Sequence, residues 1–177
     1  MSQDQPRGSE PQAPAPEPDP VRQQLALERL KSEQNLPAGL LAGLIGSLVG
    51  AAAWALVTAF TRLQIGWMAI GVGFLVGSAL RSYGKGLDRV FGVAGALLAL
   101  LGCALGNLLA VCIMVAEREK IPLATVLAGL DLDAILNLMS ATFSPMDLLF
   151  YGIALYEGYR LSFRRVSQED LAKVLAI

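Results

Sequence analysis

Residues 34–61, QNLPAGLLAGLIGSLVGAAAWALVTAFT, contain no charged side chain, and neither do residues 90–116, VFGVAGALLALLGCALGNLLAVCIMVA. A helix rises about 1.5 Å per residue, so about 20 apolar residues cross the hydrocarbon core of a bilayer. Both stretches are long enough. The sequence therefore predicts a membrane protein built from transmembrane helices.

The amino-acid composition agrees with a membrane protein and argues against several kinds of function. The chain has 177 residues, of which 54% are hydrophobic and 16% are charged, whereas soluble domains carry about 25% charged residues. The net charge of -1 argues against nucleic-acid binding, which needs a basic face. No histidine occurs, which removes the commonest general base and metal ligand. We expect no enzyme, no cofactor and no bound metal.

Two shorter apolar segments complete the predicted fold. We expect an all-α membrane protein, a four-transmembrane-helix bundle with short amphipathic helices between the third and fourth spans. The membrane domain is assigned to residues 35–165, with spans at about 36–61, 65–83, 88–116 and 145–164. Asn35 is a candidate N-cap for the first span, and Arg81 must snorkel toward the headgroups for the second span to be long enough.

The segment 117–144 is expected on the extracytoplasmic side. Its first four residues, Glu117-Arg118-Glu119-Lys120, cannot lie in hydrocarbon and mark the exit of the third span. Prolines, glycine and aspartates then favour two short helices, at about residues 122–130 and 133–142. These helices lie on the surface or re-enter the membrane, with a full extra span as a lesser alternative. Ser144-Pro145-Met146-Asp147 has the pattern of a capping box for the fourth span.

The two ends of the chain are expected in the cytoplasm. Residues 1–20 hold six of the nine prolines and are expected to be disordered. Residues 21–34 predict a juxtamembrane helix, and residues 166–177 predict a short helix that begins at Ser167. Lys and Arg gather near the ends of the predicted spans on the side of both termini, which places that side in the cytoplasm.

Small residues recur along the predicted spans. Stripes of glycine let helix backbones approach closely in lipid, where hydrophobicity cannot drive association. The candidate packing residues are Gly39, Gly43, Gly46, Gly50, Gly73, Gly77, Gly95, Gly102 and Gly106. We expect these stripes to pack within one subunit, or the face on the first span to bind a second copy or another protein.

Few polar residues fall inside the spans. Asn107 is a candidate for an interhelical hydrogen bond or a ligand site. Glu157, Arg160 and Arg164 are spaced for ion pairs along one helix, and Tyr156 lies beside them. This group predicts an interfacial anchor or a site for a headgroup or a proton-coupled solute.

One long part of the sequence resembles a known family. QIGWMAIGVGFLVG at residues 64–77, LALLGCALGN at residues 98–107 and SPMDLLFYGIALYEGYR at residues 144–160 are similar to uncharacterised bacterial four-span inner-membrane proteins. Some members carry a Cys-rich zinc-ribbon segment ahead of the membrane region, where this chain has a Pro-rich tail without cysteine. The resemblance covers roughly residues 36–165 and implies a bacterial inner-membrane location, without a known activity.

The function expected from these features is non-enzymatic. The chain is predicted to act as a scaffold, an accessory subunit or a self-associating helical assembly, with the lipid bilayer and another copy or another membrane protein as partners. The alternative is a small-solute transporter or channel. Such a protein would have to be oligomeric, because four helices from one copy enclose too small a path for a solute.

Overall fold

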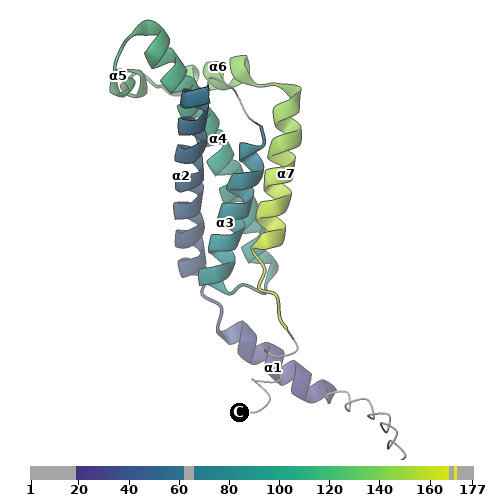
Figure 1. Cartoon of the computed structure of the whole chain (residues 1–177). Coiled ribbons are helices and arrows are strands. Elements are labelled where there is room, and N and C mark those ends of the chain that lie inside the picture. The colour runs from purple at the N-terminus through teal and green to yellow at the C-terminus, as the bar shows by residue number, and fades with distance from the viewer. Residues whose placement is uncertain (1–18, 62–65, 168–169, 171–177) are drawn as a thin grey trace, which may run out of the picture.

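All regular elements in the described part of the chain are α-helices, which confirms the predicted all-α class. The computed structural model describes residues 19–61, 66–167 and 170 (Figure 1). The helices are α1 (Pro20–Ser32), α2 (Leu36–Thr61), α3 (Met68–Gly84), α4 (Arg89–Glu119), α5 (Leu123–Ala128), α6 (Leu132–Thr142) and α7 (Pro145–Leu161).

Four of these helices form a bundle. α2, α3, α4 and α7 lie side by side, with α1 at one end and α5 and α6 at the other (Figure 1). α2 packs against α3 and α4, α7 packs against the same two helices, and α3 also touches α4. Thus α3 and α4 form the middle of the bundle, and α2 and α7 lie on either side of them.

The helices differ in their length relative to a membrane. α2 has 26 residues and α4 has 31, and both are long and apolar enough to cross. α3 and α7 have 17 residues each, or about 25 Å, against a hydrocarbon core of about 30 Å. α7 is long and apolar enough to cross a membrane only if it is counted together with α6, and the two helices are bent by 104° relative to each other. The helices described here therefore include two or three candidate spans, fewer than the four predicted.

Several helix boundaries depart from the predicted spans. α3 begins at Met68 rather than near residue 65, and residues 62–65 lie outside the described part of the chain. α4 continues past residue 116 through the charged run to Glu119, because Lys120 ends it in a left-handed conformation with φ 54°. α7 stops at Leu161 rather than residue 164, and the backbone N–H of Arg164 instead donates to Gly86 at 2.8 Å.

The helix-start signals read from the sequence are confirmed. Asn35 accepts a hydrogen bond from Ala38 N at 3.0 Å and caps α2. Ser144 and Asp147 form the predicted capping box of α7, with Ser144 N donating to Asp147 Oδ2 at 2.8 Å. Ser167 and Asp170 exchange the same pair of bonds, although most of the helix predicted after them lies outside the described residues.

The segments that flank the bundle are helical as expected. The predicted juxtamembrane helix is α1, which begins after Asp19, whose carboxylate accepts from Val21 N at 3.1 Å. The two short helices predicted between residues 117 and 144 are α5 and α6. The proline-rich segment before residue 19 lies outside the described part of the chain.

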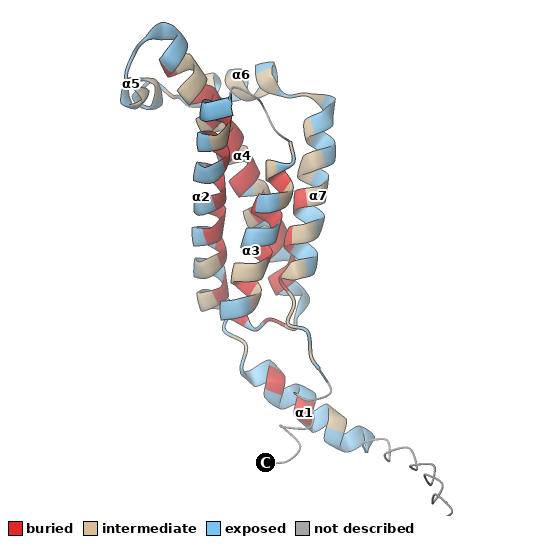
Figure 2. Ribbon diagram, in the orientation of Figure 1, coloured by how far each residue is buried: buried red, intermediate tan, exposed pale blue. Residues whose placement is uncertain are grey.

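The core of the bundle combines a few large side chains with many small ones. Its buried cluster consists of Trp54, Ala69, Val72, Val76, Ala99, Cys103 and Ala154. Buried residues line the faces that the four helices turn toward one another, and exposed residues cover the outside (Figure 2). The Trp54 ring meets the Tyr151 ring edge-on, with centroids 6.4 Å apart. The small residues around these rings let the backbones approach.

Candidate functional site: an apolar groove and a polar clasp

The glycine face of α2 is used inside the chain. A methyl group on Gly39 would lie 2.9 Å from Gly84 Cα on α3, and one on Gly43 would lie 2.8 Å from Leu98 Cδ1 on α4. At Gly46 and Gly50 the nearest neighbours are Leu75 and Val72 of α3, at 3.3 and 3.1 Å. This face therefore packs against α3 and α4, and of its four glycines only Gly46 also borders an open groove.

The glycines of α3 and α4 also mark close approaches within the bundle. A methyl group on Gly73 would lie 2.6 Å from the carbonyl oxygen of Ala154 in α7, and one on Gly77 would lie 2.7 Å from Leu161 Cβ. The other three sites face neighbouring helices in the same way: Gly95 faces Gly158 and Ser162, Gly102 faces Ser47 and Val72, and Gly106 faces Ala51 and Trp54. All nine predicted packing glycines thus lie at helix contacts within one copy.

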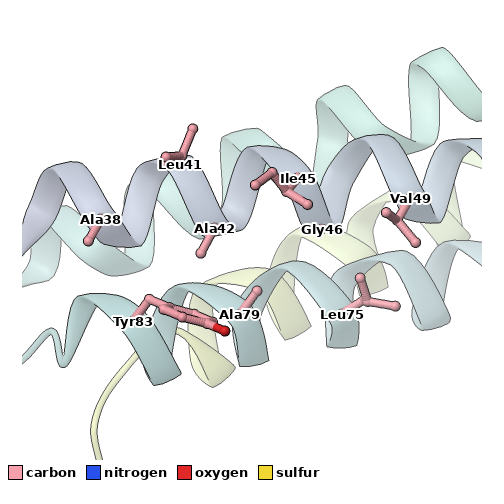
Figure 3. Close-up of a pocket in the computed structure, with 9 residues that line it drawn as sticks. All are labelled: Ala38, Leu41, Ala42, Ile45, Gly46, Val49, Leu75, Ala79 and Tyr83. Atoms are coloured by element: carbon pink, nitrogen blue, oxygen red, sulfur yellow. The ribbon is translucent and has the colours of Figure 1, made fainter.

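An apolar groove runs along the outside of the bundle between α2 and α3 (Figure 3). It has a volume of about 450 Å³ and is lined by Ala38, Leu41, Ala42, Ile45, Gly46, Val49, Leu75, Ala79 and Tyr83. Leu41, Ile45 and Val49 are all more than half exposed. Sequence reasoning missed this groove. The small residues Ala38, Ala42 and Gly46 at four-residue spacing mark the α2 side of the groove, but they do not indicate the gap between α2 and α3.

The length of the groove follows from the stretch of α2 that lines it. From Ala38 to Val49 it extends along α2 for about 17 Å, which is roughly half of the hydrocarbon thickness. The aromatic ring of Tyr83 lies at the same end of the groove as Ala38 (Figure 3). An apolar helix or an acyl chain is the ligand class that such a lining accepts.

A second feature lies at the end of the bundle nearest α1, and we call it the polar clasp. It consists of Glu33, Gln34, Lys85, Asp88 and Arg164, and it joins the α1–α2 linker, the α3–α4 loop and the segment after α7. Glu33 Oε2 accepts a hydrogen bond from Arg164 Nη1 at 2.9 Å and lies 3.7 Å from Lys85 Nζ. One carboxylate oxygen therefore meets two cations from distant parts of the chain.

Gln34 makes the second half of the polar clasp. Its Oε1 accepts from Leu87 N at 2.8 Å and from Asp88 N at 3.1 Å, while its Nε2 donates to Asp88 Oδ2 at 2.9 Å. The backbone N–H of the next residue, Asn35, donates to the carbonyl oxygen of Gly84 at 2.9 Å. The α1–α2 linker is thus fixed to the α3–α4 loop by side-chain and backbone bonds together.

The charge of Glu33 is stabilised by this arrangement. The hydrogen bond from Arg164 lowers the pKa of Glu33 below its ordinary value of 4.5, and the charges of Arg164 and Lys85 act in the same direction against partial desolvation. Lys85 itself has φ 49°, a left-handed conformation that glycine or asparagine usually adopts at a helix end. Its backbone N–H donates to the carbonyl oxygen of Arg81 at 3.1 Å.

The four residues predicted as a polar site do not come together. Asn107 is buried in α4 and lies about 18 Å along that helix from Gly95, which is the residue that faces Gly158 of α7. Glu157, Arg160 and Tyr156 lie on α7 one turn or less from Gly158. Within the described residues neither Glu157 nor Arg160 forms an ion pair, so the pairing predicted along α7 is wrong, and Arg164 pairs with Glu33 instead.

The described residues contain no candidate metal-binding site. No group of three His, Cys, Asp or Glu side chains that could hold an ion occurs among them. Cys103 and Cys112 are free thiols buried in the bundle.

The fold and these two features define an all-helical chain with helices long and apolar enough to cross a membrane. Comparison with protein-family models, with curated proteins and with solved structures found no match to this chain. Its groove and its polar clasp must therefore be interpreted from their own geometry.

Proposed function

We propose that this chain is a non-enzymatic multi-pass protein of the bacterial inner membrane that acts as a self-associating helical scaffold. The groove between α2 and α3 carries this proposal, because it combines small residues such as Ala42 and Ala79 with exposed apolar side chains. Small residues permit the close backbone approach on which helix association in lipid depends. An accessory-subunit role would use the same groove for a helix of a different membrane protein.

Four membrane crossings are part of the proposal. α3 and α7 are each about 25 Å long, and they pack along α2 and α4, which are candidate spans. A short helix spans when the bilayer thins or when flanking cations snorkel. Arg81 at the end of α3 and Arg160 at the end of α7 are placed to do so.

The orientation follows from the distribution of cations. Lys31, Lys85, Arg89, Arg164 and Arg165 lie near the end of the bundle that carries α1, and cytoplasmic segments carry an excess of Lys and Arg. This distribution supports a cytoplasmic location for both termini. The resemblance described above supports a bacterial inner membrane.

An oligomeric transporter or channel is the alternative function. The middle of the bundle is filled by side chains, with Trp54, Val72, Val76 and Cys103 each at most 3% exposed. A solute path would therefore have to run between copies rather than through one. The groove is the surface along which two copies would meet in either case.

Cysteine crosslinking in membranes tests the scaffold proposal. With the buried Cys103 and Cys112 replaced by alanine, Ala42→Cys places a thiol in the groove, and Leu44→Cys places one at nearly the same depth of α2, away from the groove. Oxidation is expected to give a covalent dimer of the Ala42→Cys protein and little dimer of the Leu44→Cys protein. Equal crosslinking of the two, or none, would contradict self-association through this groove.

A further inference from the structure

The polar clasp contains a pair of cations whose shared anion is part of the same chain. Arg164 Nη1 and Lys85 Nζ lie 2.9 and 3.7 Å from Glu33 Oε2. We propose that Arg164 and Lys85 form a phosphate-binding site, and that Glu33 occupies this site until a phosphate group takes its place and loosens α1.

The two cations are held by bonds that do not involve Glu33. The backbone N–H of Arg164 donates to the carbonyl oxygen of Gly86 at 2.8 Å, and Asn35 N donates to the carbonyl oxygen of Gly84 at 2.9 Å. Lys85 lies between these two glycines, and its own N–H is bonded to Arg81. Loss of the Glu33 carboxylate therefore leaves the backbone of the α3–α4 loop at Lys85, and the backbone at Arg164 after α7, in position.

The chemistry of the pair suits a phosphate group. A guanidinium presents five N–H donors in a planar fork, and an ammonium adds a compact charge with three donors. Glu33 receives a hydrogen bond from one nitrogen of Arg164 through a single oxygen, which leaves donors on both cations for further acceptors. A phosphate has more acceptor oxygens than a carboxylate and can engage both cations at once.

The location of the site favours a lipid headgroup as the source of the phosphate. This step relies on the proposed membrane location, in which the polar clasp lies at the cytoplasmic surface, where anionic lipids concentrate near basic residues. The Arg164 side chain is 23% exposed and the Lys85 side chain is 53% exposed. Both are therefore open to a headgroup from the adjacent leaflet.

Displacement of Glu33 by a phosphate group would change how α1 is attached to the bundle. Glu33 is the C-cap residue of α1, so its bond to Arg164 fixes the end of that helix to the bundle. Gln34 keeps the linker attached to the α3–α4 loop when Glu33 leaves. Phosphate binding is therefore expected to loosen the attachment of α1 to the bundle, leaving the Lys31–Asp88 pair as a weaker contact, while the bundle remains intact.

Native mass spectrometry of the full chain, after exchange into detergent with either phosphatidylglycerol or phosphatidylcholine, tests the site. Glu33→Gln is expected to retain several-fold more phosphatidylglycerol than the unmodified protein, because the competing carboxylate is gone. Adding Arg164→Gln or Lys85→Gln is expected to remove that gain. Adding Lys31→Gln is the matched control, because this neighbouring cation pairs with Asp88, and the gain is expected to persist.

Two further measurements test whether the site binds the phosphate group itself and whether binding loosens α1. If inorganic phosphate displaces phosphatidylglycerol from Glu33→Gln, and does so only while Arg164 and Lys85 are present, the site binds the phosphate group itself. Tryptic cleavage at Arg29 in the unmodified protein is expected to be faster in phosphatidylglycerol than in phosphatidylcholine nanodiscs.

Certain results would overturn the phosphate site. These are no gain in phosphatidylglycerol retention by Glu33→Gln, an unchanged gain after loss of Arg164, and cleavage rates that do not depend on the headgroup. A crosslinking failure at Ala42 would count against the scaffold without touching these readouts, so the two proposals fail separately.

Discussion

The guanidinium of Arg164, beyond the end of α7, lies 2.9 Å from the carboxylate of Glu33 at the end of α1, although 131 positions separate the two residues. This ion pair connects the segment that enters the bundle to the segment that leaves it. Lys85, in the loop between α3 and α4, lies beside the same carboxylate. A change at Glu33 is therefore expected to affect three segments together.

Acidification should release this contact. Arg164 holds the pKa of Glu33 below its ordinary value, so the stabilisation is present above the unfolded-state pKa and is lost as pH falls through the lower folded-state pKa. Pulsed EPR distances between labels at Arg22→Cys and Val93→Cys should broaden at acid pH. The same labels on a Glu33→Gln background should show the broad distribution already at neutral pH, and a sharp distribution there would argue against the contact.

Neighbouring positions on α2 should respond differently to the same enlargement. Ala42 lines the groove, so Ala42→Leu should fill the groove and weaken self-association while the monomer stays folded. Gly43 faces Leu98 inside the bundle, so Gly43→Leu should destabilise the monomer by about 1–3 kcal/mol through overpacking. Sedimentation and thermal unfolding in detergent would separate the two effects. Loss of assembly in Gly43→Leu without loss of stability would return the interface to the glycine face.

Two glycines of α3 that are separated by one residue, Gly71 and Gly73, offer a matched pair for testing helix packing. Gly73→Ala would place a methyl group 2.6 Å from the carbonyl oxygen of Ala154, whereas a methyl group on Gly71 would have nothing within 4 Å. Gly73→Ala should therefore cost about 1–3 kcal/mol of unfolding free energy. Gly71→Ala should be neutral or stabilising by up to about 1 kcal/mol, because alanine favours the helix. Equal effects in an equilibrium unfolding assay would contradict the close approach of α3 and α7.

What the sequence could predict depends on how local the signal was. The capping residues Asn35, Ser144 and Asp147 act on amides within three positions, so their bonds followed directly from the residue pattern. The apolar lengths of α2 and α4 were equally local. The glycine stripes indicated which faces pack, but they carry no information about whether the neighbour is the same chain or another copy.

The features that the sequence did not reveal depend on pairing across the fold. Arg164 was expected to pair along its own helix with Glu157, whereas α7 ends at Leu161 and the chain turns toward Glu33. The groove required knowledge of how far α2 and α3 diverge on their outer side. Neither the direction of a chain after a helix end nor the gap between two helices is contained in a local pattern.

Buried hydroxyls in the bundle provide a test of polar satisfaction. The Thr58 hydroxyl is fully buried in α2 and has no hydrogen-bond partner within the described residues. Thr58→Val removes the hydroxyl at similar size, so it should be neutral or should raise the unfolding free energy by about 1–3 kcal/mol, the cost of an unsatisfied buried group. Chemical or thermal unfolding would measure the change. A clear destabilisation would mean that the hydroxyl is bonded in the membrane, for example to water.

The capping box at the start of α7 should control the sharp bend between α6 and α7. Ser144 Oγ accepts from Met146 N at 3.3 Å, and Asp147 accepts from Ser144 N at 2.8 Å. Ser144→Ala should lower the free energy of unfolding by about 1 kcal/mol. Hydrogen exchange should become faster at the first amides of α7 but not near Ala154. Ser140→Ala is the control, because that hydroxyl bonds to the carbonyl oxygen of Asn137 within α6 and caps no helix start. If both variants exchange alike at the start of α7, the bend is held by packing of α6 and α7 rather than by the cap.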